Sequence, residues 1–220
     1  MIRTVFVLPT LLLLSAVMAY AQSTPGLVGR VDDRTYISPG GVYRVRVPVL
    51  PELGGTISDT GNVVVFRDDY NVHVSIGSFP LDATQRWELS TRGLKDYLPA
   101  FFASLVMPDF QKMFPGTHIE SGVYLPNFLG GSLLCYTLLP GGSMFVAELG
   151  DIQPSGGPPV AKRGNLIFMQ NHVVYVISIE LAERSLEGAL YNKTTEQENT
   201  ILRSRLNDVV STMEFAVPNE

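Results

Sequence analysis

The sequence predicts an α+β fold, in which a central antiparallel sheet has helices packed on it. Three observations favour this class. Several short segments alternate apolar and polar residues like half-buried strands, the region Trp87–Phe114 has a helical period, and a second helical pattern precedes the C-terminus. Gly, Pro, Asn and Asp separate the strand-like segments as they do in hairpins, so we expect neighbouring strands to run antiparallel.

The segment Met1–Ala21 has the organisation of a secretory signal peptide. Arg3 precedes an apolar run from Val5 to Val17, and the small residues Ala19 and Ala21 stand where signal peptidase recognises its substrate. We therefore expect cleavage and a mature chain in the periplasm or outside the cell.

A retained membrane anchor is the alternative for this segment. An anchor needs about 20 unbroken apolar residues, whereas this run is shorter and contains Pro9. No Cys follows Ala21, which argues against a lipoprotein, and no later stretch is long and apolar enough to span a bilayer. The mature protein is expected to begin near Gln22 and to be soluble.

One domain is predicted after a short leader. Gln22–Thr35 is polar, contains Pro and Gly and has no period, so we expect a flexible leader, and residues 36–217 are long enough for one domain with a full core. The chain has 45% hydrophobic and 17% charged residues, which is typical of a globule. Its net charge of −5 and lack of clustered Lys and Arg argue against a nucleic-acid partner.

Three strands are predicted in the first half of the domain. Tyr43–Val47 alternates apolar residues with arginines and ends at Pro48. Asn62–Phe66 and Asn71–Phe79 follow, joined by the turn-forming Asp68–Asn71. In the third strand, the predicted buried face comprises Val72, Val74 and Ile76, and the opposite face His73 and Ser75.

A helical region is predicted over Trp87–Phe114, and Pro99 and Pro108 should kink or divide it. Gly116 ends this region, and Thr117–Leu125 resumes the alternation of a strand. The apolar stripe of the helical region comprises Leu94, Leu98, Phe101, Phe102, Leu105 and Val106.

Two hairpins are predicted in the second half. The Gly- and Pro-rich segment Gly150–Gly164 separates them as the longest loop. The paired segments are Ser132–Leu139 with Met144–Leu149, and Leu166–Met169 with Val173–Leu181.

The clearest helix lies near the C-terminus. Thr195 and Glu198 can form a capping box at its start. Its apolar residues recur at helical spacing and are Leu202, Leu206, Val209, Val210 and Met213.

Three stretches have the pattern of a known group of proteins. They are Tyr36–Gly41 leading into Val45–Pro48, Val64–Asp69 leading into Val72–Ile76, and the late hairpin followed by Leu206–Phe215. In them the chain resembles the exported proteins related to PsbP of photosystem II and the wider Mog1/PsbP-like group. The resemblance implies an α/β/α sandwich around an antiparallel sheet, in a binding or assembly module without a common catalytic site.

The strongest candidates for metal ligands are Asp68, Asp69 and His73, which a hairpin tip could bring together. We favour the competing interpretation, in which the aspartates form a turn and the histidine faces solvent, because metal sites usually have more ligands. We expect neither a metal nor a cofactor.

A hydrolytic site would need a nucleophile, a base and a carboxylate in one place. Ser132 and Ser143 follow paired glycines, yet they open strands and do not form a nucleophile elbow. No spacing joins His118 or His172 to either serine. The candidate carboxylates form no privileged pair and are Glu52, Asp59, Glu88, Asp109, Glu120, Glu148 and Glu180.

Cys135 is the single cysteine, so the chain can form no intramolecular disulfide. It lies in an apolar strand-like run, where burial would raise the pKa of the thiol, and a reactive nucleophile is the less favoured alternative. Paired glycines such as Gly40–Gly41 lack the Lys and Ser/Thr of a phosphate loop and are expected in turns. Asn192–Thr194 would be a glycan acceptor in a eukaryotic secretory route.

Two surfaces are candidates for partner binding. One is the loop Gly150–Gly164, because long loops on rigid sheets often carry recognition. The other is an aromatic stripe whose default interpretation is core packing, and which comprises Trp87, Tyr97, Phe101, Phe102, Phe110 and Phe114.

These observations favour a noncatalytic exported module that binds a protein or another envelope component. The alternative is an extracytoplasmic hydrolase with an unrecognised active site. The two hypotheses differ in one structural expectation, because a hydrolase requires a pocket in which Ser, His or carboxylate groups converge within hydrogen-bonding distance.

Overall fold

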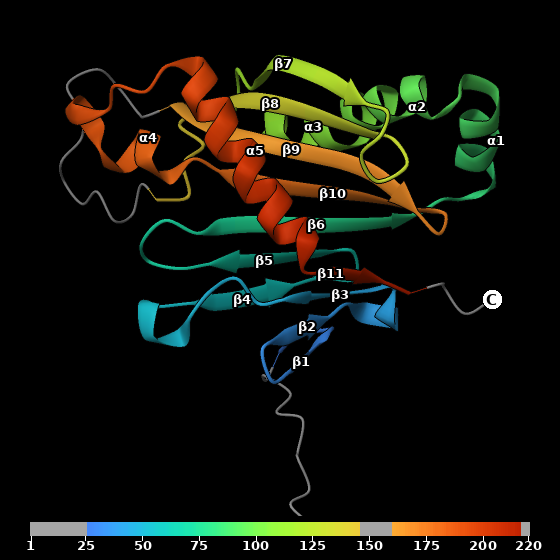
Figure 1. Ribbon diagram of the computed structural model, residues 1–220, viewed down its shortest axis with the longest axis horizontal. Coiled ribbons are helices and arrows are strands. Elements are labelled where there is room, and N and C mark those ends of the chain that lie inside the picture. The colour runs from blue at the N-terminus through green and yellow to red at the C-terminus, as the bar shows by residue number, and fades with distance from the viewer. Residues whose placement is uncertain (1–25, 146–159, 217–220) are drawn as a thin grey trace, which may run out of the picture.

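The computed structural model describes residues 26–145 and 160–216. These residues form two antiparallel sheets, and helices pack on both faces of the larger one, which confirms the predicted α+β class. Figure 1 shows α5 (Thr195–Ser211) crossing in front of the large sheet, with α2 (Leu94–Phe101) and α3 (Met107–Met113) behind it.

In the described residues, the large sheet has the strand order β4-β5-β6-β10-β9-β8-β7 and the small sheet the order β1-β2-β3-β11. The strand nearest the C-terminus therefore pairs with one near the N-terminus. The strands of the large sheet are β4 (Thr56–Asp59), β5 (Val63–Arg67), β6 (His73–Pro80), β7 (His118–Leu125), β8 (Ser132–Pro140), β9 (Val160–Gln170) and β10 (Val173–Glu180). Those of the small sheet are β1 (Arg30–Asp32), β2 (Thr35–Ile37), β3 (Tyr43–Arg46) and β11 (Met213–Phe215).

The remaining α-helices of the described residues are α1 (Ala83–Arg92) and α4 (Ala182–Leu186). Short 3-10 turns lie at Pro39–Gly41, Pro51–Leu53 and Gly188–Leu190.

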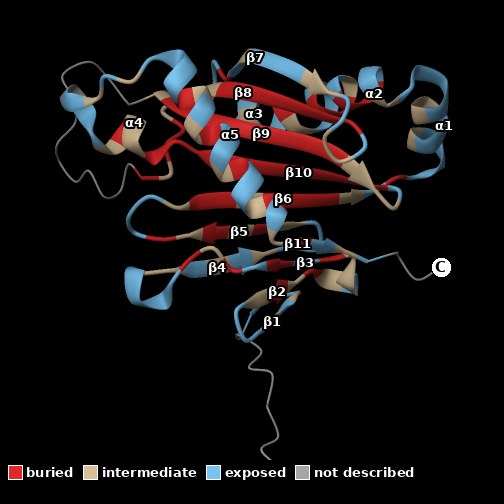
Figure 2. Cartoon of the chain, viewed as in Figure 1, coloured by how far each residue is buried: buried red, intermediate tan, exposed pale blue. Residues whose placement is uncertain are grey.

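The large sheet separates two apolar cores. Its central strand β10 is buried along its whole length, as Figure 2 shows, because both faces of the sheet are covered. One core lies between the two sheets and α5 and includes Phe66, Tyr175 and Leu206. The other lies under α2 and α3 and includes Leu98 and Ile167.

The N-terminal part is more ordered than the sequence predicts. Residues 26–35 belong to the expected flexible leader, yet they contain β1 and the start of β2, and Val31 pairs with Tyr36. Strand β4 was not predicted either, because its four residues follow two glycines and give too short a pattern.

The first of the two late hairpins is different from the prediction. Met144 and Phe145 lie in a turn, and residues 146–149 lie outside the described ranges. Strand β8 pairs with β7 on one side and β9 on the other, so it has no edge left for the predicted partner. Because β9 begins at Val160, residues 160–164 of the predicted loop Gly150–Gly164 lie in a strand, and residues 150–159 are not described.

The predicted helical region is divided at other positions. Gly93, with φ 76°, separates α1 from α2, whereas Pro99 lies inside α2 and Pro108 in the first turn of α3. Residues 102–106 form a π-helical segment, in which hydrogen bonds span one residue more than in an α-helix. This change of phase turns Leu105 outward, and its side chain is 51% exposed.

The C-terminal helix is confirmed with small differences. Its capping box is formed by Thr194 and Gln197, one residue before the predicted pair. Met213, predicted as part of the helix, lies in β11. The buried residues of the helix include Leu202, Leu206 and Val210 as predicted.

Candidate binding groove

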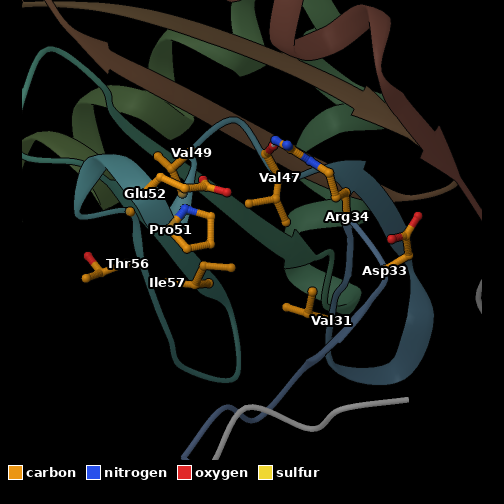
Figure 3. A pocket seen from close by; sticks show the side chains of 10 residues that line it. Val31, Asp33, Arg34, Val47, Val49, Pro51, Glu52, Thr56 and Ile57 are labelled. Atoms are coloured by element: carbon orange, nitrogen blue, oxygen red, sulfur yellow. The ribbon is translucent and has the colours of Figure 1, made fainter. Parts of the chain in front are cut away.

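An apolar groove lies between β4, at the edge of the large sheet, and the small sheet (Figure 3). Its volume is about 620 Å³. The aliphatic lining comprises Val31, Val47, Val49, Pro51 and Ile57, and the polar lining Asp33, Arg34, Glu52 and Thr56.

The connection from β3 to β4 shapes one wall of this groove. Pro48 and Pro51 end the strand, and Pro51–Leu53 forms a 3-10 turn. The main-chain nitrogen of Gly55 then donates to the oxygen of Leu50 at 2.9 Å. A Cβ atom on Gly55 would lie 2.5 Å from that oxygen, so this tight return requires glycine and delivers the chain into β4 beside the groove.

Asp59, at the end of β4, fixes the N-terminal segment next to the groove. Its carboxylate accepts hydrogen bonds from the main-chain nitrogens of Val28 and Gly29, at 2.8 and 2.7 Å, and from the Tyr36 hydroxyl at 2.7 Å. Burial raises the pKa of Asp59, but these three hydrogen bonds outweigh burial and lower it below its usual range. The carboxylate therefore has a structural role in placing β1.

A buried charge cluster lies away from the groove, where α5 meets the large sheet. The Nζ atom of the fully buried Lys162 lies 2.9 Å from Glu198 and 2.5 Å from Glu120. Glu198 also accepts hydrogen bonds from Arg184 at 2.6 Å and Tyr191 at 2.5 Å. Burial raises the pKa of Glu198, but the hydrogen bonds from Tyr191, Lys162 and Arg184 outweigh it and lower the pKa. The cluster ties α4 and α5 to β7 and β9.

A second buried cluster lies on β9 and β10. Glu180 accepts a hydrogen bond from the Ser143 hydroxyl at 2.6 Å and lies 3.7 Å from the Arg163 guanidinium. Burial raises the pKa of Glu180. On β6, burial together with the charges of Arg163 and Arg67 lowers the pKa of His73 to about 3, so this imidazole is neutral at neutral pH.

The candidate metal ligands have other roles. The Oδ1 atom of Asp68 accepts hydrogen bonds from the main-chain nitrogens of residues 70–72, which is the turn function we favoured. His73 is not solvent-facing as expected but only 4% exposed, because the sheet is covered on both faces here. Among the residues described, no three His, Cys, Asp or Glu side chains form a group that could hold a metal ion.

The candidate hydrolytic residues are dispersed. Ser132 is buried on β8, while His118 on β7 and His172 in the β9–β10 turn are exposed. The Ser143 hydroxyl donates to Glu180, and the other neighbour of Glu180 in that cluster is Arg163. The candidate carboxylates are also dispersed. Glu52 lines the groove, and Asp59 binds the N-terminal segment. Glu88 pairs with Arg92 on α1, Asp109 lies in the first turn of α3, Glu120 and Glu180 lie in the two charge clusters, and Glu148 is outside the described residues.

The aromatic stripe is mostly core, which was its default interpretation. Tyr97, Phe101 and Phe102 are buried in the core under α2 and α3. Trp87 is 66% exposed on α1. Cys135 is buried as predicted, and burial raises its pKa to about 12.

Ala19 and Ala21, the predicted recognition residues for signal peptidase, lie outside the described ranges. Within residues 26–145 and 160–216, no helix is both long and apolar enough to cross a membrane.

Sequence reasoning named Glu52 but missed the aliphatic lining of the groove. Val31 belongs to the expected leader and Ile57 to a strand that was not predicted. In the sequence, only the glycine and proline residues before β4 indicated a tight turn at this place.

Comparison with solved structures finds chains of the group that the sequence resembles. The Ran-binding protein Mog1p of Saccharomyces cerevisiae is 11% identical, with a TM-score of 0.48, and the match covers 84% of this chain and 95% of that chain. The cyanobacterial PsbP protein CyanoP of Synechocystis sp. PCC 6803 is 11% identical, with a TM-score of 0.47, over 83% of this chain and 91% of that chain. No protein-family model matches the sequence, and no curated protein matches it either.

Proposed function

We propose that this chain is a noncatalytic binding module that acts outside the cytoplasm and holds part of a partner protein in the groove between β4 and the small sheet. The observation that supports this function is the groove itself, in which aliphatic side chains surround about 620 Å³ of open space. Concave apolar surfaces of this kind mark interaction sites in soluble domains. Among the described residues, neither a Ser nor a His lines the groove beside its two carboxylates, Asp33 and Glu52, so hydrolysis by a Ser–His pair has no comparable support.

Cross-linking from the groove tests the binding function. A photoreactive amino acid at Glu52, which is exposed and lines the groove, should form a specific adduct with a protein in the exporting organism. The same group at Asn207, exposed on α5, is the control.

A matched pair of substitutions makes this test specific for the groove. Ile57→Glu places a charge in the apolar lining and should abolish the adduct from position 52, whereas Ser58→Glu, on the exposed opposite face of β4, should preserve it. An adduct that forms equally from position 207, or that survives Ile57→Glu in a folded protein, would argue against the groove as the binding site.

Export is tested by the N-terminus of the mature protein. The run Val5–Val17 with Ala19 and Ala21 supports cleavage after Ala21, so protein recovered from the envelope or medium should begin at Gln22. Replacing both alanines with Asp should block processing and leave the precursor uncleaved. Protein that stays in the cytoplasm with Met1–Ala21 attached would contradict this part of the proposal.

A further inference from the structure

We propose that the groove binds an extended polypeptide segment, which adds to the free edge of β4 as a further strand and carries aliphatic side chains at alternate positions and a basic residue at each end. This inference rests on the proposed function and specifies the chemistry of the bound segment.

The first support is the hydrogen-bonding edge of β4. In the described part of the chain, β4 ends the large sheet and pairs with β5 alone. The nitrogen of Thr60 donates to the oxygen of Val63 at 2.8 Å, and hydrogen-bonded residue pairs alternate with non-hydrogen-bonded pairs along antiparallel strands. Ser58 therefore directs its main-chain groups to β5, whereas the N–H and C=O of Ile57 point away from β5. Such an edge can pair with an incoming strand.

The second support is the position of the apolar lining relative to that edge. Successive side chains of an added strand would point to opposite faces of the sheet. On the face of Ile57 they would meet Val31 and Val47 across the groove. On the other face they would lie beside Ser58, which is exposed. Alternation of aliphatic and polar residues satisfies both faces.

The third support is the charge around the groove. Glu52 and Asp33 lie on opposite sides of it, as Figure 3 shows. The guanidinium of Arg34 donates to the main-chain oxygen of Val47 at 3.4 Å, so one of its terminal nitrogens is already hydrogen-bonded within the protein. With two carboxylates against one guanidinium, the groove is complementary to a segment with Lys or Arg near both ends.

Synthetic peptides provide the test. We would use a short peptide of alternating Val and Thr with a Lys at each end, and a second peptide in which both Lys are Glu. The first should bind in a saturable manner and slow hydrogen exchange of the Ile57 amide, and the second should bind about fivefold more weakly, as expected for exposed ion pairs.

Two further comparisons test the binding mode. N-methylation of the peptide nitrogens that face β4 should weaken binding about tenfold or more, while N-methylation of the alternate nitrogens should have little effect, because only the former lose a hydrogen bond. Ile57→Glu should abolish binding, whereas Ser58→Glu should retain it.

Each contrary outcome is distinct. Equal sensitivity to both N-methylation patterns, or equal affinity of the Lys and Glu peptides, would overturn the proposed binding mode. The proposed function would still stand if the cross-linked adduct forms from position 52 as expected. Pairing of β4 between two copies would appear as a dimer that the peptide does not dissociate, and an apolar small molecule that binds where peptides fail would also overturn the inference. Failure of both the peptides and the cross-linking would remove the function as well.

Discussion

Lys162 shows how this fold accommodates a charge in its interior. Its ammonium group is fully buried and has two carboxylates within 3 Å, Glu198 at 2.9 Å and Glu120 at 2.5 Å. Removing a charged group from water is costly, and the attraction between buried partners offsets that cost only with good geometry and further hydrogen bonds. Arg184 and Tyr191 supply those bonds to Glu198, so the carboxylate is the centre of the cluster.

Glu198→Gln should therefore destabilise the protein by about 3 kcal/mol, because Lys162 loses one of its two counter-charges in a buried site. Urea denaturation followed by circular dichroism measures this free energy of unfolding. Glu196→Gln, at an exposed position of the same helix, is the control and should change stability by less than about 0.5 kcal/mol. Equal effects of the two substitutions would show that the cluster adds nothing to stability.

Stability should also depend on pH through Asp59 and Glu198. The folded protein lowers the pKa of both groups below their ordinary values of 3.8 and 4.5. Such carboxyls stabilise the fold above the unfolded pKa, and this contribution is lost as pH falls through the folded pKa. We expect the free energy of unfolding to fall on acidification below the ordinary carboxyl values, and less steeply in Asp59→Asn and Glu198→Gln. Parallel curves for all three proteins would contradict this linkage.

At the level of elements, the long and strongly periodic segments could be predicted from the sequence. Helix α5 has 17 residues with a buried face, and the shorter strand β3 alternates buried apolar residues with exposed arginines, so their patterns specify both type and orientation. Strand β1 has only three residues, and β4, although as long as β3, contains a single apolar residue, Ile57. Leu105 was assigned to the wrong face because the π-helical segment changes the phase of the helix, which no spacing rule anticipates.

Packing of α5 on β9 depends on Gly164. A Cβ atom at this position would lie 3.0 Å from Cβ of Leu202 and 3.2 Å from Cδ1 of Leu206, closer than ordinary contact. Gly164→Ala should therefore move α5 from the sheet and lower the free energy of unfolding by about 1–3 kcal/mol. Gly61→Ala is a matched control, since nothing lies within 4 Å of the added atom. Thermal denaturation of both variants provides the comparison, and equal melting temperatures would show that α5 adjusts without cost.

At the level of the whole molecule, the two sheets and α5 share one core, so they should unfold together. Val45 of β3 is buried in this core, as are Val64 of β5 and Leu206 of α5. Val45→Ala deletes two buried carbon groups in the small sheet and should cost about 2 kcal/mol. Because the core is shared, the far-ultraviolet and near-ultraviolet dichroism transitions should shift together. Separate transitions would instead indicate that the small sheet unfolds alone.

The candidate site was the least predictable part of the molecule. The groove is built by residues of β1, of the turn that follows it, of the connection from β3 to β4 and of β4, which meet only after the two sheets have packed together. None of these residues has a chemical signature, because aliphatic side chains become a binding surface through their arrangement alone. Charged and nucleophilic residues such as Glu180 and Ser143 could be named from the sequence, yet they lie in a buried cluster that supports the fold.

The pairing of β11 with β3 determines when folding can finish. Glu214 lies opposite Arg44, so the small sheet lacks a strand until residues 213–215 have left the ribosome. Contacts between such distant parts of a chain form late and slowly. Until β11 emerges, β3 presents an unpaired edge, which is open to pairing with another unfinished chain.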